Sequence, residues 1–317
     1  MAAYKLPVPQ STLAPINAAT RLCAVLGSPI RHSASPAMHN AAFAALGLDW
    51  RYLAFEVDPK NLRAAIEGAR AMNFAGLNLT VPHKLLAVDM VDELDISAKV
   101  WGAVNTIRFE GRTVKSDWLP LREFAREPPV EIRSQGFNTD AVGLTSSLRE
   151  DLKIDLQGKK VLLLGIGGAG RTAALKLASE NVSELFLVNR TFSKVLELQE
   201  EIKREFPSVY VGLGYPKTGV DLVINATSLG LKTEDVSPLD ETQFSLNQAR
   251  AVYDMIYKPA ETKLLAVAKA AGCRTANGIG MLVHQGAKAF EIWTGQPAPV
   301  DVMRRAVEKS VYGPDAK

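Results

Sequence analysis

The stretch KKVLLLGIGGAGRTAALKLA, from Lys159 to Ala178, decides the fold of this 317-residue chain. Val161 to Leu164 form an uninterrupted apolar run, which is typical of a parallel strand covered on both faces. Four glycines follow within the next six residues, and a helical pattern begins at Arg171. Glycine permits a tight turn and a close approach of backbone N–H groups to a phosphate, and the N-terminus of a helix attracts an anion. The stretch therefore predicts the strand, turn and helix of a Rossmann-type dinucleotide-binding unit.

The segment after the next predicted strand bears on the kind of dinucleotide. A site for NAD carries Asp or Glu about 20 residues after the glycines, where the carboxylate holds the ribose 2′-OH. This chain has Asn189, Arg190 and Thr191 there, with Lys194 shortly after. A guanidinium at that point suits a 2′-phosphate, so the segment favours NADP(H). The structural alternatives are an ordinary tight turn at the glycines and a solvated helix start after the strand.

Composition indicates a globular protein of two domains, because the chain is long and 47% of its residues are hydrophobic. The net charge of 37 − 34 = +3 is too small to predict a nucleic-acid or anionic-membrane partner. No run approaches the length of a membrane span. Cys23 and Cys273 stand in apolar contexts, which predicts buried free thiols in the cytoplasm. No metal is expected, because metal-ligand spacing is missing from the four histidines, His32, His39, His83 and His284.

From residue 21 onward, strand and helix patterns alternate, which predicts an α/β architecture. Strands are expected at 21–30, 50–57, 75–81, 100–109, 161–164, 185–188, 220–230, 251–257 and near 273, and helices at 35–47, 59–72, 83–94, 139–152, 171–178, 194–206, 262–272 and 281–293. Residues 1–20 are expected to form a loose arm, with an organelle transit peptide as the alternative. Residues 110–135 are charged, contain three prolines and show no sustained period, so a surface excursion is predicted there.

Polar residues stand at four further places where predicted strands end or helices begin, as at the binding edge of an α/β sheet. They are Ser33 and Ser35 in IRHSASP, Lys84 in NLTVPHK, Asn105 in GAVNT and Asp140 in GFNTD. A lysine at a helix start opposes the helix dipole, so Lys84 needs another reason for its position. Lys84 is a candidate proton carrier, and Asp140 is a candidate partner that orients it. The alternatives are helix caps for the serines and Asp140, and a solvated surface for Lys84.

Together these motifs resemble the shikimate dehydrogenase family, from about residue 21 to residue 293. In order they are PIRHSASPAMHN, NLTVPHK, GAVNT, GFNTD, GIGGAG, NRT, INATSLG and GIGMLVHQGA. The resemblance implies the reversible NADPH-dependent reduction of 3-dehydroshikimate to shikimate, in aromatic amino-acid (chorismate) biosynthesis, by a cytoplasmic monomer or homodimer. It also implies an N-terminal α/β substrate domain (21–140, completed by 280–317) and a Rossmann-type NADP-binding domain (141–279), with a deep cleft between them. The long excursion and the N-terminal arm depart from the family pattern.

The resemblance also implies roles for individual residues, with Lys84 and Asp140 as the catalytic pair. The residues that it assigns to the substrate are Ser33, Ser35, Thr80, Asn105, Tyr257 and Gln285. The residues that it assigns to NADP(H) are Gly165, Gly167, Gly168, Ala169, Asn189, Arg190, Thr191, Lys194, Thr227 and Gly278.

Two other functions remain open at this point. Stretches such as YLAFEVD and AGCRTANGIGML also look like a quinate/shikimate dehydrogenase with broader substrate and NAD/NADP use, although Ser33, Ser35 and Thr80 favour shikimate. A non-catalytic sensor of shikimate-type metabolites belongs to another class. Such a sensor is expected to lack Lys84 or Asp140 or to carry a DNA-binding module, and the intact pair argues against it.

Overall fold

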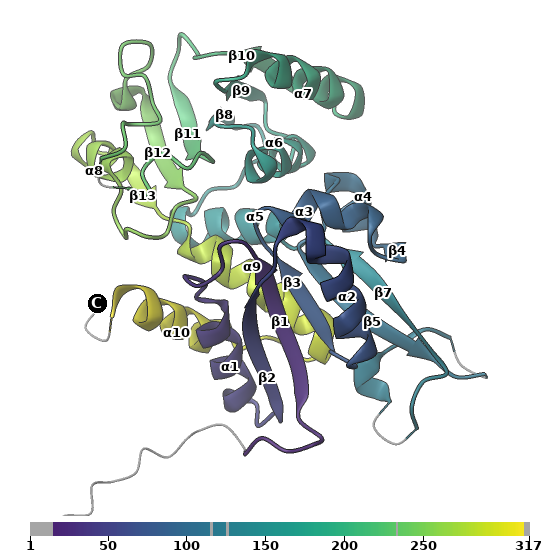
Figure 1. Cartoon of the computed structure of the whole chain (residues 1–317). Helices are drawn as coiled ribbons and strands as arrows, with labels where there is room; N and C mark the ends of the chain where they lie inside the picture. Colours follow the sequence, from purple (N-terminus) through teal and green to yellow (C-terminus); the bar gives the residue numbers. More distant parts are fainter. Residues whose placement is uncertain (1–14, 115–116, 125–126, 233, 314–317) are drawn as a thin grey trace, which may run out of the picture.

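The computed structural model describes residues 15–114, 117–124, 127–232 and 234–313. In this part of the chain two sheets lie in separate halves of the molecule, and helices α5 (Asp140–Leu152) and α9 (Ile279–Thr294) run between them (Figure 1). The first fourteen residues of the predicted N-terminal arm lie outside the described residues. The α/β architecture expected from the alternating patterns is confirmed.

The first sheet is mixed and has the order β2-β1-β3-β5-β7-β4, with β6 beside β5. Its strands are β1 (Arg21–Gly27), β2 (Trp50–Glu56), β3 (Gly76–Leu79), β4 (Glu93–Leu94), β5 (Thr106–Arg112), β6 (Leu119–Pro120) and β7 (Glu131–Phe137). The helices connecting them are α1 (Ser35–Ala45), α2 (Leu62–Ala71), α3 (His83–Leu86) and α4 (Ile96–Trp101), with short 3-10 turns η1 (Pro59–Asn61), η2 (Ala87–Asp89) and η3 (Leu121–Glu123). Because side chains alternate along a strand, β1 contributes Cys23 and Val25 to a core with α1 and α9, and Ala24 and Leu26 to a core with α2.

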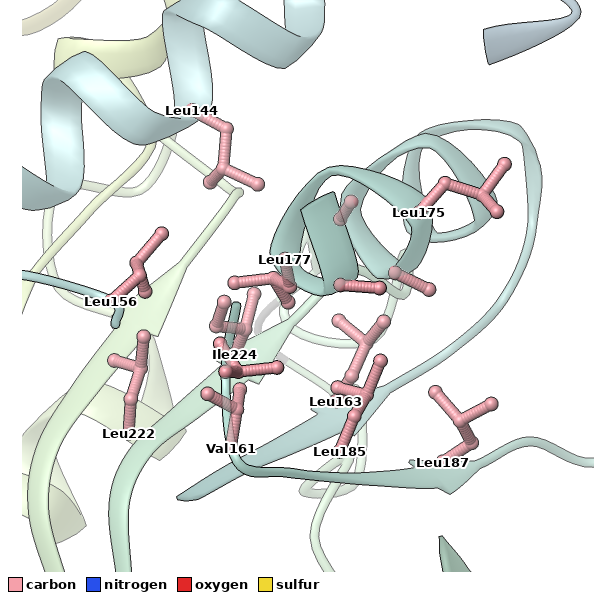
Figure 2. Packing of buried hydrophobic residues seen from close by; sticks show 14 of the residues in the cluster. Leu144, Leu156, Val161, Leu163, Leu175, Leu177, Leu185, Leu187, Leu222 and Ile224 are labelled. Atoms are coloured by element: carbon pink, nitrogen blue, oxygen red, sulfur yellow. The ribbon is translucent and has the colours of Figure 1, made fainter. Parts of the chain in front are cut away.

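The second sheet is parallel throughout, in the order β10-β9-β8-β11-β12-β13. Its strands are β8 (Lys160–Leu164), β9 (Glu184–Val188), β10 (Tyr210–Leu213), β11 (Val220–Asn225), β12 (Ala249–Asp254) and β13 (Arg274–Ala276). Its helices are α6 (Gly168–Ser179), α7 (Phe192–Glu205) and α8 (Lys263–Ala270), with the 3-10 turn η4 (Leu246–Gln248). Figure 2 shows Leu177 of α6 directed at Val161 and Leu163, whereas Leu162 and Leu164 belong to the core on the opposite face. The expected strand with two covered faces is therefore present.

Several expected elements differ from those observed. The helix predicted at 83–94 ends with η2 at Asp89, because β4 pairs with β7 and withdraws Glu93 and Leu94 from it. Strand β10 and the last helix, α10 (Val300–Tyr312), were not predicted. The helix expected at 59–72 ends at Ala71, and Met72 beyond it is 65% exposed.

The segment 110–135 is only partly a surface excursion. β5 continues to Arg112 and β7 begins at Glu131, and the two strands pair antiparallel along their length. Glu110 is 3% exposed there and forms ion pairs with Arg108 and Arg133, so its charge is compensated inside the strand pair. These strand ends contain alternating charged residues, so their hydrophobic pattern did not predict strands there. No described residue of this segment lines the cavity that contains Lys84 and Asp140.

The connection between β6 and β7 instead supports the end of α9. The Arg122 guanidinium donates to the carbonyl oxygens of Ile292 (3.3 Å) and Trp293 (2.9 Å). These carbonyls belong to the last turn of α9, where a cation also interacts favourably with the helix dipole. Arg21 of β1 in turn donates to the Leu121 and Arg122 carbonyl oxygens, which fixes the segment to the sheet.

Replacement of Arg122 should therefore destabilise the protein. We expect Arg122→Ala to lower the free energy of unfolding by about 1–3 kcal/mol, because two helix-end carbonyls lose a charged donor. Urea unfolding followed by circular dichroism measures this. Arg204→Ala on α7, where the arginine side chain is 72% exposed, should leave the midpoint unchanged. Equal midpoints for all three proteins would mean that the contact does not stabilise α9.

Candidate active site

A cavity of about 280 Å³ opens between the first sheet and the N-terminal half of α9. Eight of the residues predicted from the sequence line it: Ser33, Ser35, Thr80, Lys84, Asp140, Tyr257, Gly278 and Gln285. The sequence did not single out the other lining residues: Val25, Pro29, Ile30, His32, Asn78, Leu79, Met255, Met281 and Leu282. The predicted polar positions, which are up to 252 residues apart (285 − 33), thus converge on one concave surface.

Lys84 and Asp140 form an ion pair on this surface, with 2.6 Å between Lys84 Nζ and Asp140 Oδ2. The Lys84 side chain is 28% exposed, and that of Asp140 only 7%. Asp140 is the first residue of the thirteen-residue helix α5, where the helix dipole favours a carboxylate. The Lys84 ammonium is therefore held by the Asp140 carboxylate on one side and remains accessible from the cavity on the other. A proton carrier needs this arrangement.

The other oxygen of Asp140 is held from behind. Asn105 Nδ2 donates to Asp140 Oδ1 (2.9 Å), and Asn105 Oδ1 accepts from the Thr139 backbone N–H (2.8 Å). Asn105 is 1% exposed and is not among the cavity-lining residues. The carboxylate consequently has both oxygens occupied by donors, and its orientation is fixed.

A second buried layer extends this support toward β2. Tyr52 donates to Asn78 Oδ1 (2.6 Å), and Asn78 Nδ2 donates to Thr106 Oγ1 (2.9 Å) and to the Asn105 carbonyl oxygen (3.1 Å). Burial raises the pKa of Tyr52 well above its usual range, so the phenol stays protonated and can donate its hydrogen bond to Asn78. Asn78 also lines the cavity, two residues before Thr80 on the same face of the strand end. That spacing within NLTVPHK was the signal that could have identified it.

Ser35 does not cap helix α1, although helix capping was the structural alternative for the two serines. Helix α1 begins at Ser35, but no side chain caps it in the usual way, and Ser35 is 7% exposed. It is Ser33 whose Oγ accepts from the Ser35 backbone N–H, at 3.3 Å. A capping function for Ser35 is therefore wrong, and both serines line the cavity.

The opposite wall comes from the end of β12 and the start of α9. Burial raises the pKa of Tyr257, so its phenol is neutral near pH 7. At Gly278, a Cβ would come within 2.0 Å of the Met255 carbonyl oxygen, so glycine is required for the close approach of the two segments. Gln285 lies about two turns further along α9, and its Nε2 donates to the Leu282 carbonyl oxygen.

The glycine turn satisfies the geometric requirements of a phosphate site. Gly165 has φ +89°, and a Cβ at Gly170 would come within 2.0 Å of the Gly165 carbonyl oxygen, so both positions need glycine for the fold itself. Gly167 and Gly168 are different, because a Cβ at either would meet no atom within 4 Å. These two glycines and Ala169 are exposed at the start of α6, and they leave room for a ligand beside the helix N-terminus.

The remaining predicted cofactor residues lie around this turn. Asn189 joins two segments, because its Oδ1 accepts from the Ile166 backbone N–H (3.2 Å) and its Nδ2 donates to the Thr191 carbonyl oxygen (3.1 Å). Arg190, Thr191 and Lys194 are exposed at the end of β9 and the start of α7. The charges of Arg190 and Lys194 are thus available at the position expected for a 2′-phosphate.

Thr227 connects the glycine turn to the cavity. A Cβ at Gly165 would lie 2.6 Å from Thr227 Cγ2, so the two loops are in contact. The Thr227 hydroxyl donates to Asn225 Oδ1 (2.7 Å), and the Met255 backbone N–H donates to the Asn225 carbonyl oxygen (2.9 Å). Met255 lines the cavity. The glycine turn and one wall of the cavity are therefore both held at the ends of the neighbouring strands β8, β11 and β12.

The fold and site thus consist of two parts, one with a glycine turn at the start of a helix in a parallel sheet and the other with the lysine–aspartate pair beside a cavity. Family models match residues 25–107 (shikimate dehydrogenase substrate binding domain), 147–232 (shikimate / quinate 5-dehydrogenase) and 278–308 (shikimate 5'-dehydrogenase C-terminal domain). A shikimate dehydrogenase (NADP(+)) of Methanopyrus kandleri is 39% identical over 299 residues, which cover 92% of this chain and 96% of the relative. The chain belongs to the shikimate dehydrogenase family.

Solved structures agree with this assignment. A crystal structure of a shikimate dehydrogenase in complex with NADP+ has a TM-score of 0.80 and 36% identity, covering 94% of this chain and 98% of the other. The shikimate dehydrogenase of Thermus thermophilus in complex with NADP(H) and shikimate has a TM-score of 0.76 and 33% identity, covering 92% and 99%. The chain is accordingly an NADP-dependent oxidoreductase that acts on a CH–OH group, as the resemblance implied.

Two further observations concern the described residues only. None of their helices combines the length and hydropathy needed to span a membrane. Among them, no three His, Cys, Asp or Glu side chains are grouped so that they could hold a metal ion.

The glycine turn yields a test that separates folding from cofactor binding. Gly170→Ala should lower the free energy of unfolding by about 1–3 kcal/mol, because the added methyl group displaces backbone. Gly168→Ala should leave stability unchanged but weaken NADP+ binding by about tenfold or more, because the methyl group enters the ligand's space. Thermal unfolding and titration calorimetry with NADP+ measure the two effects. Wild-type NADP+ affinity in Gly168→Ala would contradict this placement of the cofactor.

Proposed function

We propose that this chain interconverts shikimate and 3-dehydroshikimate in the cavity between its two sheets, as a step of aromatic amino-acid biosynthesis. The observation that carries the proposal is the Lys84–Asp140 ion pair, which lies at the cavity together with the two serines that the resemblance assigns to a carboxylate. The Thermus thermophilus relative was solved in complex with NADP(H) and shikimate, and the Methanopyrus kandleri relative is named a shikimate dehydrogenase (NADP(+)), which supports the same substrate here. We assign the substrate side to residues 21–140 and 280–317, and the cofactor side to residues 141–279.

The reaction requires one hydride and one proton to move. When bound, NADP(H) supplies or accepts the hydride at the substrate carbon. In the direction of reduction, the Lys84 ammonium donates a proton to the carbonyl oxygen, and in oxidation the neutral Lys84 amine removes it from the hydroxyl. Asp140 holds Nζ in position, while Asn105 prevents the carboxylate from turning away.

The other cavity residues are proposed to bind the substrate. Ser33 and Ser35 would donate to its carboxylate, with Tyr257 beside that end. Thr80 and Gln285 would contact the ring hydroxyls, whereas Asn105, which was assigned to the same hydroxyls but does not line the cavity, would act through its hydrogen bond to Asp140.

The cofactor residues are proposed to divide into two groups. The backbone of Gly165, Gly167, Gly168 and Ala169 would hold the pyrophosphate at the α6 N-terminus, with Thr227 and Gly278 near the nicotinamide. The second group holds the 2′-phosphate end and consists of Asn189, Arg190, Thr191 and Lys194.

The location and assembly of the chain also remain proposals. We place it in the cytoplasm, because Cys23 and Cys273 are both buried free thiols. Sedimentation equilibrium of the purified chain decides between the expected monomer and homodimer. No nucleic-acid partner is expected.

Initial rates of nicotinamide reduction test the function directly. We expect kcat/KM for shikimate with NADP+ to exceed that of quinate, or of either substrate with NAD+, by about tenfold or more. Comparable rates with quinate or NAD+ would instead favour the quinate/shikimate dehydrogenase. Absence of turnover in a protein that still binds shikimate would favour the metabolite sensor.

The cofactor assignment has its own variant within this assay. Arg190→Ala should lower kcat/KM with NADP+ and leave the slower NAD+ reaction unchanged, because only NADP+ carries the 2′-phosphate. Arg204→Ala, at an exposed arginine in the last turn of α7, is the matched control. Equal losses with both cofactors would contradict the assignment of Arg190.

A further inference from the structure

We infer that Tyr312, the last residue of α10, is a positioning residue that holds the Tyr257 wall of the cavity at the distance that the substrate requires. The inference rests on the function proposed above and adds a residue that does not line the cavity. It depends on one hydroxyl group, the packing of one helix, and the weak support of the segment 257–261.

The Tyr312 hydroxyl joins two segments at the back of this wall. It donates to the Tyr257 carbonyl oxygen (2.7 Å) and accepts from Asn277 Nδ2 (2.9 Å). Asn277 Nδ2 also donates to the Ala260 carbonyl oxygen (2.8 Å), and Asn277 Oδ1 accepts from the Ile279 backbone N–H (3.1 Å). One phenol thus connects the chain after β12 with the chain that begins α9.

This connection matters because the segment 257–261 has little other support. Among the described residues, no backbone–backbone hydrogen bond outside regular helices and strands involves any of these five positions. The contacts that hold its carbonyl groups are those from Tyr312 and Asn277. A backbone segment held in this way moves when its few partners are removed.

Helix α10 packs against both sides of the cavity, the Tyr257 wall and the wall formed by the start of α1. Met303 and Val307 of α10 are fully buried in the core that contains α1 and α9, and the side chains of Tyr257 and Tyr312 pack against the same core. Figure 1 shows α10 lying beside α1, whose first residue, Ser35, lines the other side of the cavity. One helix therefore contacts both walls, and the Tyr312 hydroxyl is its link to the second.

The chemistry of Tyr312 fits a structural donor. Burial raises the pKa of its phenol, so the hydroxyl keeps its proton and continues to donate to the Tyr257 carbonyl oxygen through the neutral pH range. Loss of the hydroxyl leaves both the carbonyl oxygen and the Asn277 amide without this partner, whereas the ring can still pack in the same core.

The test compares Tyr312→Phe with Tyr215→Phe in the full chain. Tyr215 is half-buried, and its hydroxyl accepts one hydrogen bond from the Asp240 backbone N–H (3.0 Å), beside a core of the second sheet that contains no residue of α10. Each variant therefore loses one hydroxyl group and its hydrogen bonding. We expect Tyr312→Phe to raise the KM for shikimate about fivefold, as for one lost hydrogen bond, without changing the KM for NADP+. Tyr215→Phe should change neither KM.

Amide hydrogen exchange supplies a second measurement that does not depend on turnover. The amides of Ile256, Gly278 and Ile279 donate to groups of Asp254, Ile256 and Asn277, and they report on the joined segments. Exchange at these amides should accelerate in Tyr312→Phe and match the wild type in Tyr215→Phe.

The outcomes separate this inference from the proposed function. Unchanged exchange in Tyr312→Phe, or faster exchange with an unchanged KM for shikimate, would overturn the positioning role. Equal increases in the KM values for shikimate and NADP+ would show a general loss of structure and would overturn it as well. A wild-type chain that does not oxidise shikimate would refute the proposed function, while the exchange comparison would still decide whether Tyr312 holds the wall.

Discussion

The ion pair between Lys84 and Asp140 is the interaction on which the rest of the site depends. Asp140 lies just after β7 of the first sheet and is the first residue of α5, the helix that leads to the second sheet. Its carboxylate receives the Lys84 ammonium on one oxygen and the Asn105 amide on the other. The pair is therefore fixed at the junction of the two halves, which is where the proposed reaction requires substrate and cofactor to meet.

The sequence predicted the parts of this site whose requirements are local. The apolar run from Val161 to Leu164 became a strand with two covered faces, since its residues alternate between two cores. The glycine turn was also predictable, because a positive φ at Gly165 and a close approach at Gly170 require glycine. The convergence of Lys84 with Asp140 followed from the position of polar residues at strand ends.

Other parts depend on contacts that are distant in sequence and leave no local pattern. The ends of β5 and β7 contain alternating charges, and only the pairing of Glu110 with two arginines makes burial there acceptable. Two-residue β4 exists because β7 lies beside it, and no hydrophobic period marks so short a strand. The link from Tyr312 to the Tyr257 carbonyl oxygen joins positions 55 residues apart through a backbone atom, which sequence cannot reveal.

A double-mutant cycle on the ion pair tests the central claim most directly. The rates to compare are kcat for shikimate oxidation in the wild type, Lys84→Met, Asp140→Asn and the double variant. If the pair acts as one unit, Lys84→Met lowers kcat by about 10²-fold or more, and the double variant is no slower than Lys84→Met alone. Losses that multiply in the double variant, or a Lys84→Met protein with wild-type kcat, would contradict the account.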